Sequence, residues 1–407
     1  MFISKLRGIS VSMKYDFDKM IDRRGSGAIM TDLLQERYGR DDLLALWVAD
    51  MYFETPSPIR ESIERRLSHQ IYGYSVPAAS YWASIINWER ELHGWKIRRE
   101  EMRFIPGIVR GIAFVLQCFT QPGDKVVVQP PVYMPFLNLP RNNGRQVVEN
   151  PLVWDDSQQT YAMDLANLEE VCRREAPKVL ILSNPHNPAG IVWRKEELAG
   201  LAAICQRYGV LVISDEIHAD MAHKGFVHHP FPTVSPAAAE ISITFAAPSK
   251  TFNIAGLVSS FCVVPDPRIR DPFYRFLDAN EFGEALFLSA IATEAAFSQC
   301  GEWRRQMLDY VESNVDFVCD FLRERVPGIV AVRPQASFLI WLDCRGLGLD
   351  HAALIDLFVN RARLAFNDGE AFGHGGEGHM RMNVGAPRAM VAEAMERLEA
   401  AVKTLKK

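Results

Sequence analysis

The stretch 178–190, KVLILSNPHNPAG, opens with a short apolar run and closes on polar residues and prolines. Two later stretches have the same build: 210–220, VLVISDEIHAD, and 242–253, SITFAAPSKTFN. Apolar runs of this length, bounded by turn residues, predict buried strands. A helical pattern such as 195–208, KEELAGLAAICQRY, lies between such runs. The alternation predicts an α/β domain with a mainly parallel sheet.

Residues 103–129 extend the same pattern toward the N-terminus. RFIPG predicts a strand end that Gly107 turns into the helix VRGIAFVLQCF, and KVVVQ predicts the next buried strand. Further upstream, 58–66 and 83–94 have the period and the terminal residues of helices.

The C-terminal part predicts a separate, smaller α+β lobe. A long helical stretch runs through Arg325, two strand patterns follow at VAVRP and SFLIWLD, and a last helix begins near Arg388. We therefore expect an N-terminal segment, 1–50, that associates with the small domain, a large domain over 51–288 and a small domain over 289–407.

Composition points to small-molecule chemistry. The 407 residues are 48% hydrophobic and 23% charged, as in an ordinary globular protein with a packed core. The net charge of −5 and the lack of long basic or acidic runs argue against nucleic acid or a membrane surface as a partner.

The seven cysteines are scattered and form no CxxC pair, which argues against a disulfide framework or a zinc site and favours a reducing cytoplasm. The N-terminus has no apolar signal-peptide core, and no run is long enough to span a membrane. Met13 begins a more natural start, so residues 1–12 are interpreted as an extension without functional weight.

Polar residues follow three of the predicted strands. Asn184 and Asn187 follow the first, Asp215 the second and Lys250 the third. In open α/β sheets, ligands bind outside the carboxyl ends of the strands. We therefore expect these side chains to converge on one ligand, and their chemical types suit an electron-sink cofactor.

Motifs along nearly the whole chain resemble those of the fold type I enzymes that use pyridoxal 5'-phosphate (PLP). More narrowly, the chain resembles the cystathionine β-lyase-like carbon–sulfur lyase branch of the class I/II aminotransferases. The motifs occur in family order: WVADM, YGY, PPVY, NPHNP, SDEIHAD, PSKTFNIAGL, SFLIWLD, FNDGEAFG and RMNVGAPR.

The resemblance implies roles at the ring of PLP. Lys250 would form the Schiff base with the cofactor aldehyde and, once freed by the substrate amine, move the proton of Cα. Asp215 would keep the ring nitrogen protonated. Asn187 would donate to the phenolate oxygen, and Tyr133, in PPVY, would lie on the ring. His218, in SDEIHAD, is expected among the cofactor contacts.

The resemblance also implies the phosphate and substrate contacts. The phosphate would bind at the turn Gly107-Ile108-Val109, where a helix begins, with a hydroxyl from Ser249. Tyr74, in YGY, matches a tyrosine that reaches the phosphate from a partner subunit, which implies a homodimer. Arg381, in RMNVG, would grip the substrate α-carboxylate.

Each candidate also has an ordinary structural interpretation. A lone lysine is usually a solvated surface residue, Asp215 is of a type that caps helices, and Asn187 beside proline suits a turn. Tyr74 and Tyr133 are of a type that often only packs, and Arg381 is able to pair with a surface carboxylate. The shared motif context favours the functional interpretation.

Other site classes are not supported. His186, His218, His223, His228 and His229 lack metal-ligand spacing, so no metal is expected and most of them are interpreted as loop or surface histidines. The glycines of 372–378, FGHGGEG, do not follow a strand with dinucleotide-binding spacing and are interpreted as a mobile loop near Arg381.

Two departures from the family bear on the reaction. No arginine occurs between Lys250 and Ser260, where many aminotransferases hold the phosphate with one, and this favours the lyase branch. That branch usually reads WVADMDF, whereas here Tyr52 replaces the second aspartate, in a loop expected to border the substrate. The leading prediction is α,β-elimination on L-cystathionine or a related cysteine conjugate. Transamination is the alternative, and a non-enzymatic regulatory role is a third possibility against which the intact residue set argues.

Overall fold

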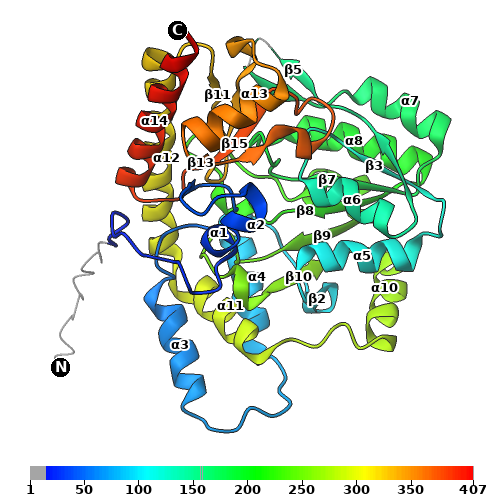
Figure 1. Ribbon diagram of the computed structural model, residues 1–407. Helices are drawn as coiled ribbons and strands as arrows, with labels where there is room; N and C mark the ends of the chain where they lie inside the picture. The colour runs from blue at the N-terminus through cyan, green and yellow to red at the C-terminus, as the bar shows by residue number, and fades with distance from the viewer. Residues whose placement is uncertain (1–14, 156, 158, 407) are drawn as a thin grey trace, which may run out of the picture.

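A seven-stranded sheet forms the centre of the larger part of the molecule (Figure 1). The computed structural model describes residues 15–155, 157 and 159–406, so the expectation for residues 1–12 lies outside the described residues. The strands lie in the order β2-β10-β9-β8-β7-β3-β4. Their bounds are β2 Met102–Ile105, β3 Lys125–Val128, β4 Gln146–Glu149, β7 Val179–Ser183, β8 Leu211–Asp215, β9 Ser242–Ala246 and β10 Ser260–Val263.

The three quoted stretches form β7, β8 and β9, which pair in parallel side by side. In this register Ser183 lies opposite Asp215, and Asp215 lies opposite Phe245. The polar residues that follow each strand therefore emerge at one edge of the sheet, as predicted.

Only β10 runs against its neighbours; it pairs antiparallel with both β9 and β2. The chain returns from β9 to β10 through the segment 247–259, which holds Lys250 and has no crossover helix. Without a helix that carries the chain back along the sheet, the chain re-enters from the edge at which β9 ends, so β10 runs antiparallel to β9. The sheet is thus mainly parallel, with one reversed strand.

Helices cover both faces of the sheet (Figure 1). One face packs on α5, α6 and α10 and the other on α7, α8 and α9, in two separate apolar cores. A parallel sheet needs this double cover because its strands are apolar on both faces. The helix bounds are α5 Ile108–Phe119, α6 Met134–Asn142, α7 Leu165–Glu175, α8 Lys195–Tyr208, α9 Pro236–Glu240 and α10 Pro267–Ala279.

The C-terminal part forms a second, antiparallel sheet in the order β11-β12-β15-β14. The long helix α12 and the last helix α14 pack beside it (Figure 1). The elements are α12 Gly301–Arg325, β11 Val330–Val332, β12 Leu339–Asp343, α13 His351–Asp356, β13 Leu364–Ala365, β14 Asn367–Asp368, β15 His379–Asn383 and α14 Arg388–Lys403. The predicted long helix, two strands and last helix occur in this order, but α13, β13, β14 and β15, which were not predicted, lie between β12 and α14.

The N-terminal segment packs on this second part. Its short strand β1, Leu44–Ala45, pairs in parallel with β13. One apolar core joins this segment to the C-terminal helices and to α3, α4 and α11. The bounds are α1 Ile29–Asp32, α2 Leu34–Tyr38, α3 Ser57–Leu67, α4 Ala79–His93 and α11 Phe287–Gln299. The division at residues 50 and 288 stays a prediction.

A small hairpin, β5 Val153–Asp155 and β6 Thr160–Ala162, completes the strands of the described residues. Within those same residues, no helix has both the length and the apolar character that a membrane span requires.

Candidate active site

One cavity of about 190 Å³ lies at the carboxyl ends of β7, β8 and β9. Most of the sequence candidates line it: Gly107, Ile108, Val109, Tyr133, Asn187, Asp215, His218, Ser249 and Lys250. Five separate parts of the chain thus meet at one point. Asn187, Asp215 and Lys250 thus lie together, whereas Asn184 does not line the cavity and its Nδ2 donates instead to the Glu216 carboxylate and the His229 oxygen.

Lys250 lies in the turn after β9, where the chain reverses toward β10. Its Nζ donates a hydrogen bond of 2.5 Å to the main-chain oxygen of Ala49. Burial lowers the pKa of Lys250 to about 8, and the neighbouring Arg381 acts in the same direction, while Asp50 and Asp215 oppose it. A lysine with a lowered pKa is partly uncharged near neutral pH, and the uncharged amine is the form that acts as nucleophile or base.

Asp215 is the last residue of β8, and its Oδ1 accepts a 3.0 Å hydrogen bond from the main-chain N–H of Ile217. Burial raises its pKa to about 7, against the opposing effects of that hydrogen bond and of Lys250. A carboxyl group with this pKa gains strongly from a positive charge placed beside it, because the opposite charge favours its ionised form.

Asn187 and Tyr133 are tied together through their main chains: the Tyr133 N–H donates to the Asn187 oxygen at 3.1 Å. Tyr133 precedes α6, and burial raises its pKa. His218, after β8, is buried, and burial together with the charges of Lys250 and Arg381 lowers its pKa to about 3. His218 is therefore an uncharged ring in this cavity at neutral pH.

Gly107 precedes the first residue of α5 and has a φ of 100°. This backbone conformation strains any residue with a Cβ, so glycine fits the turn from β2 into the helix. Ile108 and Val109 then begin α5, and both line the cavity. The first N–H groups of a twelve-residue helix therefore lie at the cavity wall, where they attract an anion.

Arg381 projects from β15 of the second sheet toward the same site. It is buried, and its Nη1 donates to the Asn187 Oδ1 at 2.9 Å. Its Nη2 donates to the Trp47 oxygen at 3.0 Å and to the Asn367 Oδ1 at 2.5 Å. Burial lowers its pKa to about 10, so the guanidinium stays charged at neutral pH.

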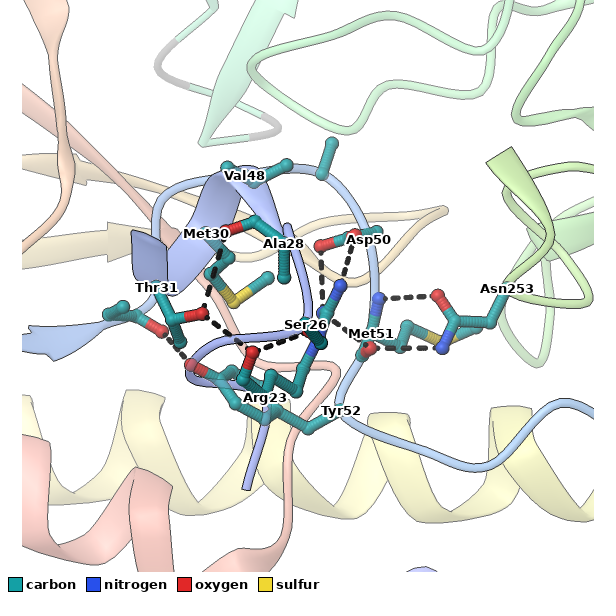
Figure 2. Close-up of polar contacts among 12 residues, drawn as sticks. Arg23, Ser26, Ala28, Met30, Thr31, Val48, Asp50, Met51, Tyr52 and Asn253 are labelled. Atoms are coloured by element: carbon teal, nitrogen blue, oxygen red, sulfur yellow. Dashed lines mark hydrogen bonds and ion pairs between the residues drawn. The ribbon is translucent and has the colours of Figure 1, made fainter. Parts of the chain in front are cut away.

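The loop 47–53 lies between Lys250 and Arg381 and is fixed from several directions. Figure 2 shows Arg23 paired with the Asp50 carboxylate through two hydrogen bonds, of 3.2 and 2.9 Å, and donating to the Met51 oxygen at 3.2 Å. Asn253, three residues after Lys250, exchanges two 2.9 Å hydrogen bonds with the Met51 main chain.

Tyr52, which departs from the family motif, does not line the cavity. Its side chain is buried, its hydroxyl donates to the Ala45 oxygen at 2.8 Å, and the Arg23 guanidinium lies 5.7 Å from its ring centroid. The expectation that the loop borders the site holds for Ala49, which lines the cavity. Tyr52 contributes to the packing behind that loop.

Tyr74 and three of the histidines lie outside the wall of the cavity. Tyr74 is fully exposed and does not line the cavity of its own chain. The histidines 186, 223 and 228 lie in loops, as expected, but they are buried rather than on the surface. These loops run over strand ends and under neighbouring elements, an arrangement that a sequence pattern does not reveal.

Several cavity residues were missed by the sequence reasoning. Ser183, Ser259 and Ser260 contribute hydroxyl groups to its wall. The Ser259 Oγ is buried and has no hydrogen-bond partner among the described residues, so it is available to a ligand. The available signal was the pair of serines at the start of β10, directly after the segment that holds Lys250. Within the described residues no group of histidine, cysteine and carboxylate side chains has the arrangement of a metal site.

Comparison with known proteins agrees with this geometry. Residues 68–398 match the family model of class I and II aminotransferases. The cystathionine β-lyase PatB of Bacillus subtilis is 40% identical over 387 residues, which cover 95% of this chain and all of PatB.

Solved structures give the same result. Cystalysin of Treponema denticola, whose structure contains PLP, superposes with a TM-score of 0.92 at 33% identity, over 97% of this chain and 100% of the other. The PLP-bound carbon–sulfur lyase of Staphylococcus hominis superposes with a TM-score of 0.90 at 31% identity, over 96% of this chain and 99% of the other. The chain belongs to the class I and II aminotransferase family, in its carbon–sulfur lyase branch.

Proposed function

We propose that the protein is a PLP-dependent carbon–sulfur β-lyase that converts L-cystathionine or a related cysteine conjugate into pyruvate, ammonia and a thiol. The observation that carries the proposal is the meeting of Lys250, Asp215 and Asn187 in one cavity beside a buried arginine. The likeness to PatB, over nearly the whole length of both chains, supports the choice of reaction.

The cavity residues fit PLP at its phosphate end. The phosphate would bind at the start of α5, where Gly107, Ile108 and Val109 present main-chain N–H groups to an anion. Ser249 lines the same cavity, and the buried Ser259 Oγ, which has no partner in the described part of the chain, offers a further hydroxyl. These groups take the place of the arginine that many aminotransferases carry after the lysine.

The cavity residues also fit PLP at its ring. Asp215 would lie against the ring nitrogen, whose positive charge favours the ionised carboxylate over the neutral form that burial favours. Asn187 would donate to the phenolate oxygen, Tyr133 would cover one face of the ring, and His218 would add an uncharged contact. When bound, PLP supplies the electron sink that makes loss of the substrate α-proton feasible.

Two residues of the chain have separate roles toward the substrate. Arg381 binds the α-carboxylate through its guanidinium, which stays charged because its pKa remains near 10. Lys250, with a pKa near 8, accepts the α-proton as the amine. Loss of this proton and departure of the thiolate from Cβ break the carbon–sulfur bond, and hydrolysis of the remaining fragment gives pyruvate and ammonia.

Elimination competes with transamination, in which Lys250 would instead return the same proton and a 2-oxo acid would leave. A thiolate is a good leaving group, so its departure from Cβ is faster than proton return when the substrate is a cysteine conjugate. The test incubates the purified protein with cystathionine and several smaller β-thio amino acids, and separately with amino acids plus 2-oxoglutarate. We expect pyruvate to form faster than glutamate, and none with the Lys250→Ala variant. Transamination without pyruvate from any thio substrate would overturn the lyase assignment.

The proposal includes a homodimer in which Tyr74 reaches the phosphate in the partner's site. Tyr74 is fully exposed in its own chain and lies in a segment with the exposed apolar residues Ile71, Tyr72 and Val76. The segments 72–77 and 283–287 together line one hollow of this surface, which is the kind of apolar patch that subunits bury.

Mixing two inactive variants tests this shared site. A Lys250→Ala subunit lacks the lysine, and a Tyr74→Ala subunit lacks the tyrosine, but a dimer of one of each contains one complete site. We expect activity to appear after the two are unfolded and refolded together, and sedimentation to show dimers. A mixture as inactive as its components would contradict the shared site.

We also propose a cytoplasmic location. The seven cysteines are free, and most are buried in the cores, as suits a reducing compartment. Cell fractionation with an antibody to the protein tests the location.

A further inference from the structure

A cluster of ionisable side chains lies buried next to the candidate active site without lining its cavity. Its members are Glu89, His93, Glu216, Asp220 and His228, and Arg304 contacts its edge. The side chains of His93 and Asp220 are 5% and 8% exposed, and those of His228 and Glu216 are 1% and 2% exposed. The chemistry proposed above uses none of them.

Asp220 is the centre of the cluster. Its Oδ1 accepts hydrogen bonds from the His93 Nε2 and the Trp88 Nε1, both at 3.0 Å. Its Oδ2 accepts a 3.3 Å hydrogen bond from the Thr251 hydroxyl. Arg304 donates to the Asp220 main-chain oxygen at 2.5 Å. Helix α4 and the turn after β9 are thereby joined at one carboxylate, and helix α12 contacts the main chain of the same residue.

The second part of the cluster is centred on Glu216, the residue next to Asp215. The Glu216 carboxylate lies 2.8 Å from the His228 Nε2 and accepts 2.8 Å hydrogen bonds from the Ser214 hydroxyl and the Phe231 N–H. The rings of His228 and His93 meet edge to face, with centroids 5.1 Å apart. The cluster therefore touches the chain neighbours of both Lys250 and Asp215.

The His93–Asp220 contact favours the charged forms of both residues. Burial opposes charge on both groups, but their mutual hydrogen bond and attraction outweigh it, so the pKa of His93 is raised and that of Asp220 is lowered. The other ionisable neighbours of His93 are Glu89, Glu216 and His228. Burial raises the pKa of Glu89 to about 8 and lowers the pKa of His228, which leaves both uncharged near neutral pH.

A buried ion pair is by itself poor evidence for stabilisation, because desolvation offsets much of the attraction. The contribution of the His93–Asp220 pair is to fix the position of the neighbouring Thr251 side chain. Thr251 is fully buried and directly follows Lys250, and a charged acceptor holds its hydroxyl more firmly than a neutral one. The orientation of Thr251 constrains the main chain from which the Lys250 side chain emerges.

We propose that His93 and Asp220 are positioning residues that hold Lys250 in its reactive orientation through Thr251. This inference rests on the proposed function, in which Lys250 carries the cofactor and moves the α-proton. Misplacement of a reacting group by about 1 Å costs roughly 10- to 100-fold in rate. Loss of the hydrogen bond between Thr251 and Asp220 is therefore expected to lower kcat by roughly 10- to 100-fold. KM is expected to stay within about twofold, because Arg381, which binds the substrate, is not affected.

The test uses Thr251→Val, which keeps the shape of the side chain but removes its hydroxyl, and His93→Gln, which removes the charge. The double variant is expected to be no slower than His93→Gln alone, because both changes disrupt the same series of hydrogen bonds, from His93 through Asp220 to Thr251. The matched control is His223→Gln, since His223 is also buried but bonds to the Pro334 and Ser337 oxygens outside the cluster. The control should keep its kcat.

A second readout avoids turnover: the rate at which the apoprotein captures PLP, followed by absorbance, should fall in Thr251→Val and His93→Gln but not in the control. Unchanged kcat and capture rates in Thr251→Val would overturn the inference, as would an equal loss in the control. Borohydride reduction with peptide mapping of the wild type keeps the two proposals apart. Absence of the label from Lys250 would reject the proposed function itself, whereas labelled Lys250 with an unaffected Thr251→Val would reject only the positioning role.

Discussion

The Arg381 Nη1 lies 2.9 Å from the Asn187 Oδ1, so the guanidinium proposed to bind the substrate carboxylate is hydrogen-bonded to the amide proposed to contact the cofactor ring. The two residues are 194 positions apart; Asn187 lies in the loop after β7 of the large sheet and Arg381 in β15 of the second sheet. The contact orients the Asn187 amide with its oxygen toward the arginine, which leaves its NH2 group free to donate elsewhere in the cavity.

Arg381→Lys is expected to weaken substrate binding while leaving cofactor binding in place. Lysine keeps the charge but loses the planar pair of donors that matches a carboxylate. Loss of a charge-assisted hydrogen bond costs about 1.5–3 kcal/mol, which corresponds to a roughly 10- to 100-fold rise in KM. Steady-state kinetics measure this rise, and Arg345→Lys, at an exposed ion pair with Asp343, serves as the control. An unchanged KM in Arg381→Lys would remove Arg381 from the substrate site.

The capture of PLP by the apoprotein is expected to speed up as pH rises through about 8. Burial lowers the pKa of Lys250 to about 8, and the uncharged amine, which attacks the aldehyde, replaces the ammonium as pH passes that value. Stopped-flow absorbance from pH 6 to about pH 11.5, which passes both values, measures the profile. A midpoint near 10.5, the ordinary value for lysine, would show that the cavity does not perturb Lys250.

Glu89→Gln is expected to stabilise the protein increasingly as pH rises from about 4.5 to 8. Burial raises the pKa of folded Glu89 to about 8 from an ordinary value of 4.5. Over this interval the unfolded chain releases a proton that the folded chain keeps, so stability falls with rising pH in the wild type. Glutamine does not titrate, so the stability of the variant does not fall for this reason.

Thermal unfolding of both proteins at several pH values measures the effect as a difference in Tm. The control is Glu91→Gln, on the exposed side of the same helix, whose Tm difference should not change with pH. A pH-independent difference for Glu89→Gln as well would mean that Glu89 is ionised in the folded protein.

The parts of the site that could be predicted from the sequence are those that local patterns encode. Lys250, Asp215 and Asn187 each follow an apolar run, and parallel strands bring their ends to one edge of a sheet. Gly107 could be placed because a strand runs into a helix at that point. Motif resemblance supplied Arg381 and Tyr133, which no periodicity indicates.

Contacts between distant segments could not be predicted in this way. Nothing near His93 indicates that it meets Asp220, 127 positions away, because the contact depends on how the end of α4 lies against the segment after β8. The reversed strand β10 also reads as an ordinary apolar run, because its residues do not indicate whether the chain is carried back along the sheet before the strand begins. The resemblance indicated that Tyr52 is unusual, but only the packing behind the loop shows that its side chain is turned away from the cavity.

Changes at Arg23 and Asp50 are expected to shift the pKa of Lys250 in opposite directions. The negative charge of Asp50 raises the pKa of Lys250, and the Arg23 guanidinium, bonded to both carboxylate oxygens of Asp50, offsets part of that charge (Figure 2). Arg23→Gln uncovers the carboxylate and should move the midpoint of PLP capture above pH 8. Asp50→Asn removes the favourable charge and leaves the arginine, so the midpoint should fall.

The double variant Arg23→Gln/Asp50→Asn separates charge from structure. If the shifts come from charge, the double variant removes both members of the pair, and its midpoint should return toward that of the wild type. If they came from movement of the loop, each single variant would displace Ala49, whose oxygen accepts the hydrogen bond from Lys250, and the double variant would displace it at least as far. Midpoints that move the same way in both single variants, and further in the double variant, would therefore show that the pair acts on Lys250 through the shape of the loop and not through its charge.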